Sequence, residues 1–229
     1  MEQCKNNTTY DREVSLRLAS AGDMMTHDNE NLFQHLESLI EMGVDPADCE
    51  QLVWQRYGKT VSVMVLDSSG FSRVSEEHGV LHFLSRLMLM RRAVKPIIEA
   101  NNPIDFHFEA DNVFAVFKHP DEAIRTAAMC HEAVFKNNVM LTEIEPFQVC
   151  IGIGYGPMLY SETLEGYFGQ EMNLASKLGE DTADGGETLI TERAYSSASV
   201  NLVTLFEKRT TFVSGLVLPY YRQEFNGEK

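Results

Sequence analysis

Apolar residues recur along this chain at two spacings, which predict where helices and strands lie. Every third or fourth position is apolar in the helical stretches, whereas the strands are short apolar runs bounded by turn residues. The predicted elements, in chain order, are helices over 11–18, 29–42 and 46–54, a strand over 61–66, helices over 71–77 and 80–100, a hairpin of strands 106–109 and 112–117, a helix over 121–137, a strand over 147–155, a helix over 170–179, a strand over 188–191 and a terminal strand or hairpin over 212–224.

The order of these elements predicts an α+β fold with a ferredoxin-like βαββαβ core. We expect a mainly antiparallel sheet with its helices on one face. Residues 1–57 are interpreted as a helical N-terminal extension, and residues 58–229 as the main domain. The extension either caps the main domain, which we favour, or serves as a dimerisation or regulatory element.

Two segments give more detailed expectations. In the helix over 80–100 we expect the methionine-rich stretch 87–90 to belong to the core. The strand over 147–155 is expected to open into a turn at Gly152-Ile-Gly-Tyr-Gly156-Pro157, which is no dinucleotide fingerprint because no helix follows it. The buried stripe predicted for the long helix consists of Leu81, Leu84, Leu87, Met88, Val94, Ile97 and Ile98.

Composition narrows the range of partners. The chain has 229 residues, of which 44% are hydrophobic, so a substantial core is expected. Its 34 acidic and 19 basic residues give a net charge of −15, which disfavours nucleic acid or an anionic membrane as a partner. No apolar run approaches the roughly 18 residues of a membrane helix, and no signal peptide is evident. We therefore expect a cytoplasmic protein with free thiols at Cys4, Cys49, Cys130 and Cys150.

Two aspartates mark the chemistry of the chain. Asp67 ends the strand Val61–Leu66, and Asp111 lies at the tip of the predicted hairpin. Taken singly, each suits a turn or a helix N-cap. Together, with Gly70 turning into a helix, they suit Mg²⁺ or Mn²⁺ holding a polyphosphate, because hard cations take oxygen ligands and a helix N-terminus offers free N–H groups.

Three motifs carry a resemblance to a known family. Asp67-Ser-Ser-Gly-Phe71 resembles an Asp-x-x-Gly-Phe metal motif, Glu109-Ala-Asp111 resembles a second motif that is usually Gly-Asp, and Phe168-Gly-Gln-Glu-Met-Asn173-Leu-Ala-Ser-Lys177 resembles a Gly-x-x-Val-Asn-x-Ala-x-Arg helix. In this order they are typical of the catalytic domain of class III nucleotidyl cyclases, the adenylate and guanylate cyclases. The resemblance extends from Val61 to about Tyr195.

The resemblance implies a ferredoxin-like fold and an active site between two such domains, in a homodimer or with another cyclase chain. It implies a two-metal reaction that converts a nucleoside triphosphate into a 3′,5′-cyclic nucleotide and pyrophosphate. Asp67 and Asp111 would bind both Mg²⁺ or Mn²⁺ ions, Asn173 would position the ribose, and Lys177 would stabilise the α-phosphate. The substrate-binding positions would be Ser68, whose carbonyl is a further metal ligand, with Gly70, Phe71, Ser72, His107 and Gly166.

Four positions depart from the family pattern. Lys177 replaces the usual Arg and so loses the two-pronged guanidinium. His107 and Gly166 stand where adenylate cyclases carry a base-selecting Lys and Asp, and Ser214-Gly215 replaces a late Lys-Gly. ATP is the default substrate, and GTP or a pyrimidine triphosphate is left open. The alternative function is an inactive cyclase-like domain that binds nucleotide or pairs with an active chain. A diguanylate cyclase or polymerase palm is disfavoured because the chain has no Gly-Gly-Asp/Glu-Glu-Phe stretch.

Overall fold

The computed structural model describes residues 31–162, 166–213 and 216–227. They fall into two compact units, one containing residues 31–59 and 159–168, the other containing residues 60–158 and 169–227 apart from the gaps. The helix predicted over 11–18 lies outside the described residues.

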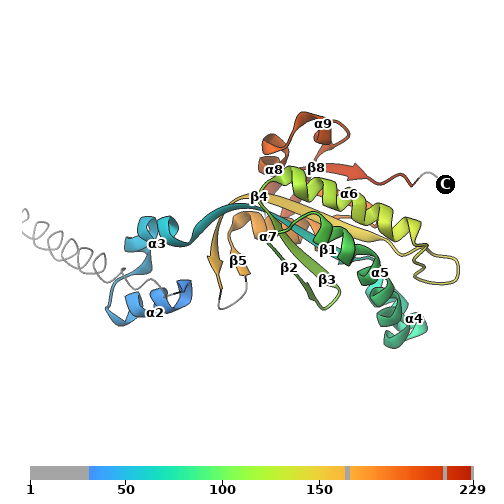
Figure 1. The fold of residues 1–229 in the computed structure, drawn as a ribbon, viewed down its shortest axis with the longest axis horizontal. Coiled ribbons are helices and arrows are strands. Elements are labelled where there is room, and N and C mark those ends of the chain that lie inside the picture. The colour runs from blue at the N-terminus through green and yellow to red at the C-terminus, as the bar shows by residue number, and fades with distance from the viewer. Residues whose placement is uncertain (1–30, 163–165, 214–215, 228–229) are drawn as a thin grey trace, which may run out of the picture. The chain divides into compact units, whose positions relative to one another are not determined.

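An eight-stranded sheet carries the fold (Figure 1). Its order is β2-β3-β1-β4-β6-β8-β7, with β5 paired to β4. The β4–β6 pair is parallel, whereas β1–β3, β2–β3, β4–β5, β6–β8 and β7–β8 are antiparallel. The strands are β1 (Gly58–Ser68), β2 (Asp105–Glu109), β3 (Asn112–Phe117), β4 (Val149–Ser161), β5 (Gly166–Phe168), β6 (Glu187–Thr191), β7 (Glu207–Val213) and β8 (Leu216–Glu224).

The first four strands lie in the order β2-β3-β1-β4, which is the ferredoxin-like arrangement expected from the sequence. The predicted hairpin is confirmed, with β2 and β3 joined through Ala110 and Asp111. The helices of this unit are α4 (Phe71–His78), α5 (Val80–Ala100), α6 (Pro120–Lys136), α7 (Gln170–Ser176), the π-helical turn η2 (Lys177–Thr182), α8 (Glu192–Ser197) and α9 (Val200–Val203).

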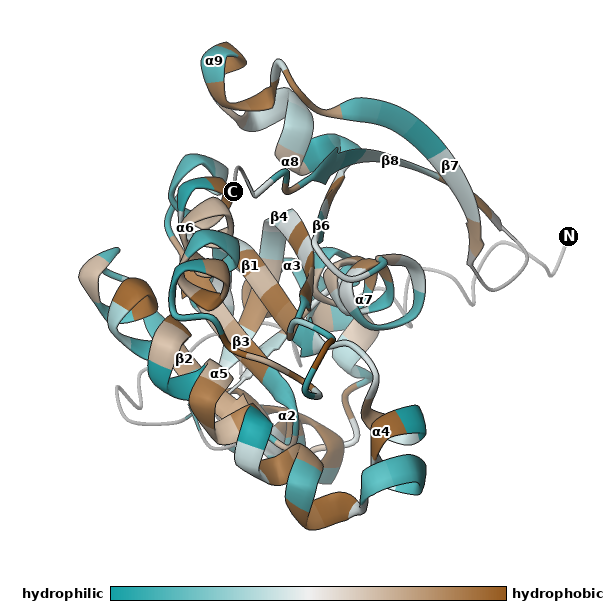
Figure 2. Cartoon of the chain, turned by 90° about the vertical axis from the view of Figure 1, so that its right-hand side faces the viewer, coloured by the Kyte–Doolittle hydropathy of each residue, from teal (hydrophilic) through white to brown (hydrophobic). Residues whose placement is uncertain are grey.

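Helices α5 and α6 pack on one face of the sheet. Alternate residues of the central strands, Met64, Leu66, Ile151 and Ile153, are fully buried in the same core as the helix residues. Figure 2 shows the contrast in hydropathy: β1 and β3 are largely brown, whereas the outer strand β7 is largely teal. The core therefore lies under the strands that carry the two aspartates.

The face of α5 that is buried differs from the prediction. Leu87, Val94 and Ile98 are buried as expected, but Leu81 is 83% exposed, and Leu84 and Met88 are also exposed. The buried stripe instead runs through Phe83, Leu87, Met90, Ala93, Val94 and Ile98. The first turns of this helix are apolar around most of their circumference, so hydrophobic periodicity alone leaves the buried face undetermined.

The predicted turn at Gly152–Gly156 is wrong, because β4 runs through it to Ser161. Its glycines occupy alternate positions and therefore face one side of the sheet. A Cβ on Gly152 would lie 2.0 Å from the Ala175 carbonyl oxygen, and one on Gly154 would lie 2.3 Å from that of Glu171. Helix α7 thus packs directly on the strand backbone, on the face opposite α5 and α6, which corrects the expectation of helices on one face only.

The first unit is a small helical cluster with its own core. Its helices are α2 (Leu32–Glu41), the 3₁₀ turn η1 (Pro46–Cys49) and α3 (Glu50–Tyr57), close to the helices predicted over 29–42 and 46–54. Asn31 caps α2 by accepting hydrogen bonds from the N–H groups of Phe33 and Gln34. The core comprises Leu32, Leu39, Cys49 and Val53.

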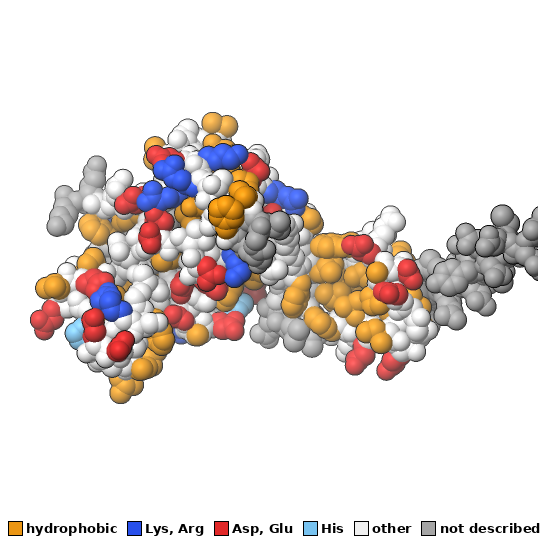
Figure 3. All heavy atoms as spheres, turned by 180° about the vertical axis from the view of Figure 1, so that it is seen from behind, with side chains coloured by type: hydrophobic (Ala, Val, Ile, Leu, Met, Phe, Trp, Pro, Cys, Tyr) orange, Lys and Arg blue, Asp and Glu red, His pale blue; other side chains and the backbone are white. Residues whose placement is uncertain are grey.

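Two expectations from composition can be checked in the described residues. Cys49, Cys130 and Cys150 are free and buried, as expected, while Cys4 lies outside the described residues. In the part of the chain that the structure describes, no helix combines the length and the apolar character that crossing a membrane requires. Figure 3 shows acidic side chains spread over one face, with Lys and Arg mainly in its upper part.

Candidate active site

The candidate site forms where β1 ends beside the start of β3. These antiparallel strands pair residue by residue up to Leu66 opposite Val113. Asp67 directly follows Leu66, and Asp111 directly precedes the first residue of β3. The register of two hydrogen-bonded neighbours therefore brings the two predicted carboxylates to one edge of the sheet.

Ser68 connects the two aspartates. Its backbone N–H donates to Asp67 Oδ1 over 2.7 Å, and its hydroxyl donates to Asp111 Oδ2 over 3.2 Å. The Ser68 side chain is buried, so this link is shielded from water. The role of the Ser68 carbonyl as a metal ligand stays a prediction, and the structure adds that its hydroxyl and N–H contact the two carboxylates.

The electrostatics of the site disfavour an ionised Asp67. Burial raises its pKa to about 6, the Ser68 N–H opposes this rise, and the charge of Asp111 adds to it. Two more carboxylates, Glu180 and Asp181, raise the same pKa further. Positive charge placed at Asp67 would relieve this repulsion.

The turn after Asp67 is held in place from several sides. Gly70 has φ = 89°, a left-handed conformation that favours glycine, and it precedes helix α4. Ser69 donates to the Gln148 carbonyl through its N–H (3.2 Å) and its hydroxyl (3.0 Å). The Phe71 ring packs edge-on against Phe83 with centroids 4.9 Å apart. The N–H groups of Phe71 and Ser72 belong to the first turn of α4, where backbone donors have no partner within the helix.

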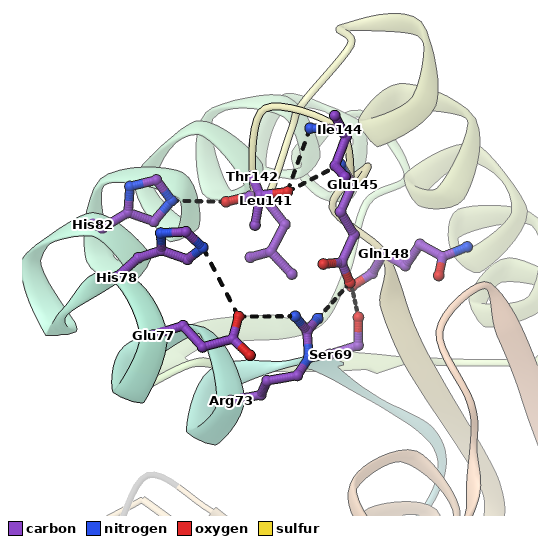
Figure 4. A network of polar contacts seen from close by, with 10 residues as sticks. All are labelled: Ser69, Arg73, Glu77, His78, His82, Leu141, Thr142, Ile144, Glu145 and Gln148. Carbon is purple, nitrogen blue, oxygen red and sulfur yellow. Dashed lines mark hydrogen bonds and ion pairs between the residues drawn. The ribbon is translucent and has the colours of Figure 1, made fainter.

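A polar network attaches α4 to the loop before β4 (Figure 4). Arg73 contacts Glu145 over 2.5 Å and Glu77 over 3.6 Å. His82, on α5, makes a 2.9 Å hydrogen bond with the Leu141 carbonyl. Residues 141–148 thereby hold the turn after Asp67 in place from the side away from the carboxylates.

The hairpin tip that carries Asp111 contains backbone strain. Ala110 has φ = 49°, in the left-handed region that a residue with a Cβ adopts at a cost of about 1 kcal/mol. The guanidinium of Arg91, on α5, donates to the Ala110 carbonyl, and it lies 4.8 Å from the centroid of the Phe108 ring. A cation on α5 therefore fixes the tip from outside the carboxylate pair.

Helix α7 and the turn η2 carry the third motif. Asn173 and Lys177 are both exposed and four residues apart, so they share one face. Lys177 Nζ lies 2.8 Å from Asp181 Oδ2, and this contact raises the lysine pKa. Exposed pairs of this kind contribute little stability, so the ammonium can exchange partners at small cost.

Glu180 is a site residue that the sequence reading missed. It accepts a 3.3 Å hydrogen bond from Asn112 Nδ2, and burial followed by the charge of Asp181 raises its pKa. No local signal marks it, since it lies in a polar stretch after Lys177. It reaches the aspartates because Gly179 packs closely on β4: a Cβ there would lie 2.9 Å from the Gly152 nitrogen.

The remaining predicted positions stand on different elements of the fold. His107, in β2, stacks on Phe114 with centroids 5.3 Å apart and is 3.9 Å from Glu109. Gly166 begins β5 and belongs to the other compact unit. Ser214 and Gly215 lie outside the described residues. The structure thus brings Asp67, Ser68 and Asp111 together, while it leaves the predicted recognition positions on separate elements.

The residues at the carboxylate pair fit a hard divalent cation. Two carboxylates and a serine supply oxygen donors, and burial, together with the charges of neighbouring carboxylates, raises the pKa of Asp67. Among the described residues, no group of three or more His, Cys, Asp or Glu side chains is arranged to hold a metal.

Comparison with known proteins gives matches in structure alone. No protein-family model matches the chain, and no curated protein matches it in sequence. An adenylate/guanylate cyclase/hydrolase from Silicibacter pomeroyi is similar with a TM-score of 0.62, at 20% identity over 72% of this chain and 95% of that one. The adenylyl cyclase CyaB from P. aeruginosa is similar with a TM-score of 0.55, at 22% identity over 74% and 96%.

A guanylyl cyclase domain from the aquatic fungus Blastocladiella emersonii, described as dimeric, is similar with a TM-score of 0.57. It shares 18% identity over 72% of this chain and 95% of that one. At such identities the likeness concerns the fold. The chain therefore has the fold of adenylate and guanylate cyclase catalytic domains, with a carboxylate pair at the end of its central strand.

Proposed function

We propose that this protein is a metal-dependent nucleotidyl cyclase, which converts a nucleoside triphosphate into a 3′,5′-cyclic nucleotide and pyrophosphate. One observation carries the proposal: Asp67 and Asp111 meet at adjacent strand ends and share Ser68, beside a glycine turn into a helix. That arrangement suits a cation-bound triphosphate, and the fold is that of known cyclases. ATP is the default substrate.

Each residue has a proposed role. Asp67 and Asp111 hold Mg²⁺ or Mn²⁺, two ions in all, which when bound supply positive charge against the triphosphate and the ribose 3′-oxygen. The N–H groups after Gly70 bind phosphate oxygens. Asn173 orients the ribose, and Lys177 leaves Asp181 to donate to the α-phosphate, whose charge grows in the transition state.

We further propose that the working site forms between two chains. Asn173, on α7, and Lys177, at the start of η2, are exposed, so a second chain can present them to the carboxylate pair of its partner. A homodimer is the simplest arrangement, and pairing with another cyclase chain is the alternative. Activity should therefore rise more steeply than linearly with protein concentration in the range where the dimer dissociates.

A second candidate function follows from the recognition positions. His107 is engaged in a stack with Phe114, and Gly166 offers no side chain to a base. A cyclase-like domain that binds nucleotide or pairs with an active chain would need no base selection. A domain without metal-dependent catalysis would gain nothing from two carboxylates held close together against their mutual repulsion. We therefore favour the enzyme.

The test is a product assay with each of the four ribonucleoside triphosphates and Mn²⁺, at protein concentrations high enough to form dimers. Cyclic product from one nucleotide supports the proposal, and Asp67→Ala should abolish it. Absence of cyclic product with all four nucleotides would overturn it in favour of the second candidate.

A matched control separates chemistry from folding. Asp105 is an exposed aspartate at the other end of the β2–β3 hairpin, opposite Val116. Asp105→Ala removes the same side chain from the same sheet without touching the carboxylate pair. It should keep full activity, whereas an equal loss in both variants would trace the effect to the fold.

A further inference from the structure

A pocket of about 530 Å³ is lined by residues other than those of the carboxylate pair. It is bounded by the end of α6, the loop 138–148 that precedes β4, and the C-terminal segment Phe225–Gly227. The segment is held there because Phe225 stacks on His131 (5.6 Å between centroids) and meets Phe135 edge-on (6.0 Å). The volume is in the range of small-molecule sites, about 300–1,000 Å³.

Among the described residues, those that line the pocket carry no formal charge. Val134, Phe135, Phe147 and Phe225 supply apolar and aromatic surface, and none of the described residues that line it is Asp, Glu, Lys or Arg. This is unusual in a chain with a net charge of −15. A charged ligand would lose its hydration here without gaining a counter-ion.

His131 is the titratable side chain among the described wall residues, and it is neutral. His131 is buried, and burial lowers its pKa to about 4. Its Nε2 lies 3.0 Å from Thr188 Oγ1, which fixes the ring. Asn138 and Gln148 add neutral amide groups at the wall, so polar recognition is limited to hydrogen bonds.

We propose that this pocket binds an uncharged, largely aromatic small molecule, and that its occupancy is transmitted to the turn that carries Asp67. Size, aromatic walls and absence of charge select this class of ligand over a nucleotide, a metabolic acid or a peptide terminus.

The transmission follows one short path. Gln148 lines the pocket, and its carbonyl accepts both hydrogen bonds from Ser69, two residues after Asp67 (Figure 4). Displacement of Gln148 by a ligand would therefore move Ser69 and, with it, the metal-binding turn. This second part rests on the proposed function, whereas binding itself does not.

The binding test uses N-phenyl-1-naphthylamine, an uncharged aromatic dye that fluoresces strongly in apolar surroundings. Titration of the full chain should give saturable binding of one dye per chain. The negatively charged anilinonaphthalene sulfonate should bind at least tenfold more weakly. Non-saturable uptake, or equal binding of both dyes, would overturn the proposal.

Two filling variants and a matched control localise the dye. Val134→Trp places a ring in the wall from α6, and Ile144→Trp does so from an exposed rim position, so one variant remains if the other does not fold. Each should weaken dye binding at least tenfold. Met129→Trp adds the same ring at an exposed position of α6 outside the pocket and should leave binding unchanged. Undiminished binding in both folded filling variants would overturn the assignment.

Transmission is measured through Mn²⁺-nucleotide binding, with and without saturating dye. We expect the affinity to change by at least twofold, and Ser69→Ala, which removes one of the two hydrogen bonds, to reduce that change. An affinity that the dye leaves unaltered would overturn the transmission. If the protein binds no nucleotide at all while the dye binds, the proposed function fails and the pocket stands.

Discussion

The carboxylate pair and the nucleotide-recognition positions are built in different ways. Asp67 and Asp111 are set by the register of two neighbouring strands and linked through one buried serine. His107, Gly166 and Lys177 stand on an outer strand, in another compact unit and on an exposed helix end. If the proposed function holds, the difference teaches that one folded chain would suffice for metal binding, whereas substrate selection would require further parts to be brought to it.

We expect the largest effect from a substitution that breaks the carboxylate pair. Asp111→Asn keeps the shape of the side chain but removes its charge, so we expect cyclic product to fall at least about 1,000-fold, since a metal–carboxylate contact contributes several kcal/mol. Mn²⁺ affinity, measured by calorimetry, should fall with it. Asp105→Asn is the matched control. Retention of more than a tenth of the activity would refute the role of Asp111.

Lys177 tests whether the exposed helix end takes part in chemistry. Lys177→Ala should lower kcat about 100-fold and change nucleotide affinity less than about threefold, as for a group that acts in the transition state. Lys177→Arg restores a two-pronged donor and should retain or raise kcat. Single-turnover and equilibrium-binding measurements separate the two quantities. Equal losses in rate and affinity would contradict the assignment.

The pH dependence of stability tests the electrostatics of the pair. Because the pKa of Asp67 is raised from 3.8 to about 6, the folded chain keeps a proton that the unfolded chain loses. The free energy of unfolding should therefore fall as pH rises from about 4 to 6 and level off above that. Asp67→Asn should remove this decline and raise stability at pH 7 by about 1–2 kcal/mol, allowing for partial exposure.

The measurement is denaturant unfolding across that pH range, read as the difference between variant and parent so that other titrating groups cancel. Mn²⁺ should stabilise the parent above pH 6 and leave Asp67→Asn nearly unaffected, since a cation replaces the missing proton. A decline of the same size in both proteins would assign the pH dependence to another group.

The strained hairpin tip predicts a stabilising substitution. Ala110→Gly removes the Cβ that disfavours φ = 49°. We expect the free energy of unfolding to rise by about 0.5–1 kcal/mol. Glycine also makes the unfolded chain more flexible, which offsets part of this gain. Thermal unfolding measures it, with Ala93→Gly in the middle of α5 as a control that should destabilise.

The smallest effect is expected at His107. Because its ring is stacked on Phe114, His107→Phe should preserve the stack and change the preference among nucleotides by less than about threefold. Competition between ATP and GTP in one assay measures this. A change above about tenfold would instead make His107 a base-reading residue and narrow the contrast between the two regions.

The parts of the fold that were predictable are those in which local sequence determines local structure. The β2–β3 hairpin and the end of β1 followed from short apolar runs with turn residues, and these place Asp67 and Asp111. The buried face of α5 was not predictable in the same way. Leu81 and Phe83 are both apolar, but Phe83 is the one that packs in the core, where it contacts Phe71 and Phe147.

Residues that only tertiary packing brings together could not be predicted from the sequence. Glu180 has no motif, and it joins the site because Gly179 lies against β4. For the alternate glycines of β4, local propensity predicts a turn, because glycine is a common turn residue, and the structure has a strand there instead. Their spacing of two was the available signal that they belong to one face of a strand.

That glycine row also sets how the third motif is held. Because bare backbone lies beneath α7, main-chain atoms of the helix lie directly against the strand, and the buried Glu171 side chain joins the helix to Tyr155 and Thr191. A saturation mutagenesis library should therefore show two opposite tolerances along a single strand: Gly152 and Gly154 admitting no other residue, and Ile151 and Ile153 accepting several aliphatic ones. The missing side chains at these alternate glycines set the distance between the strand and the segment that carries Asn173 and Lys177.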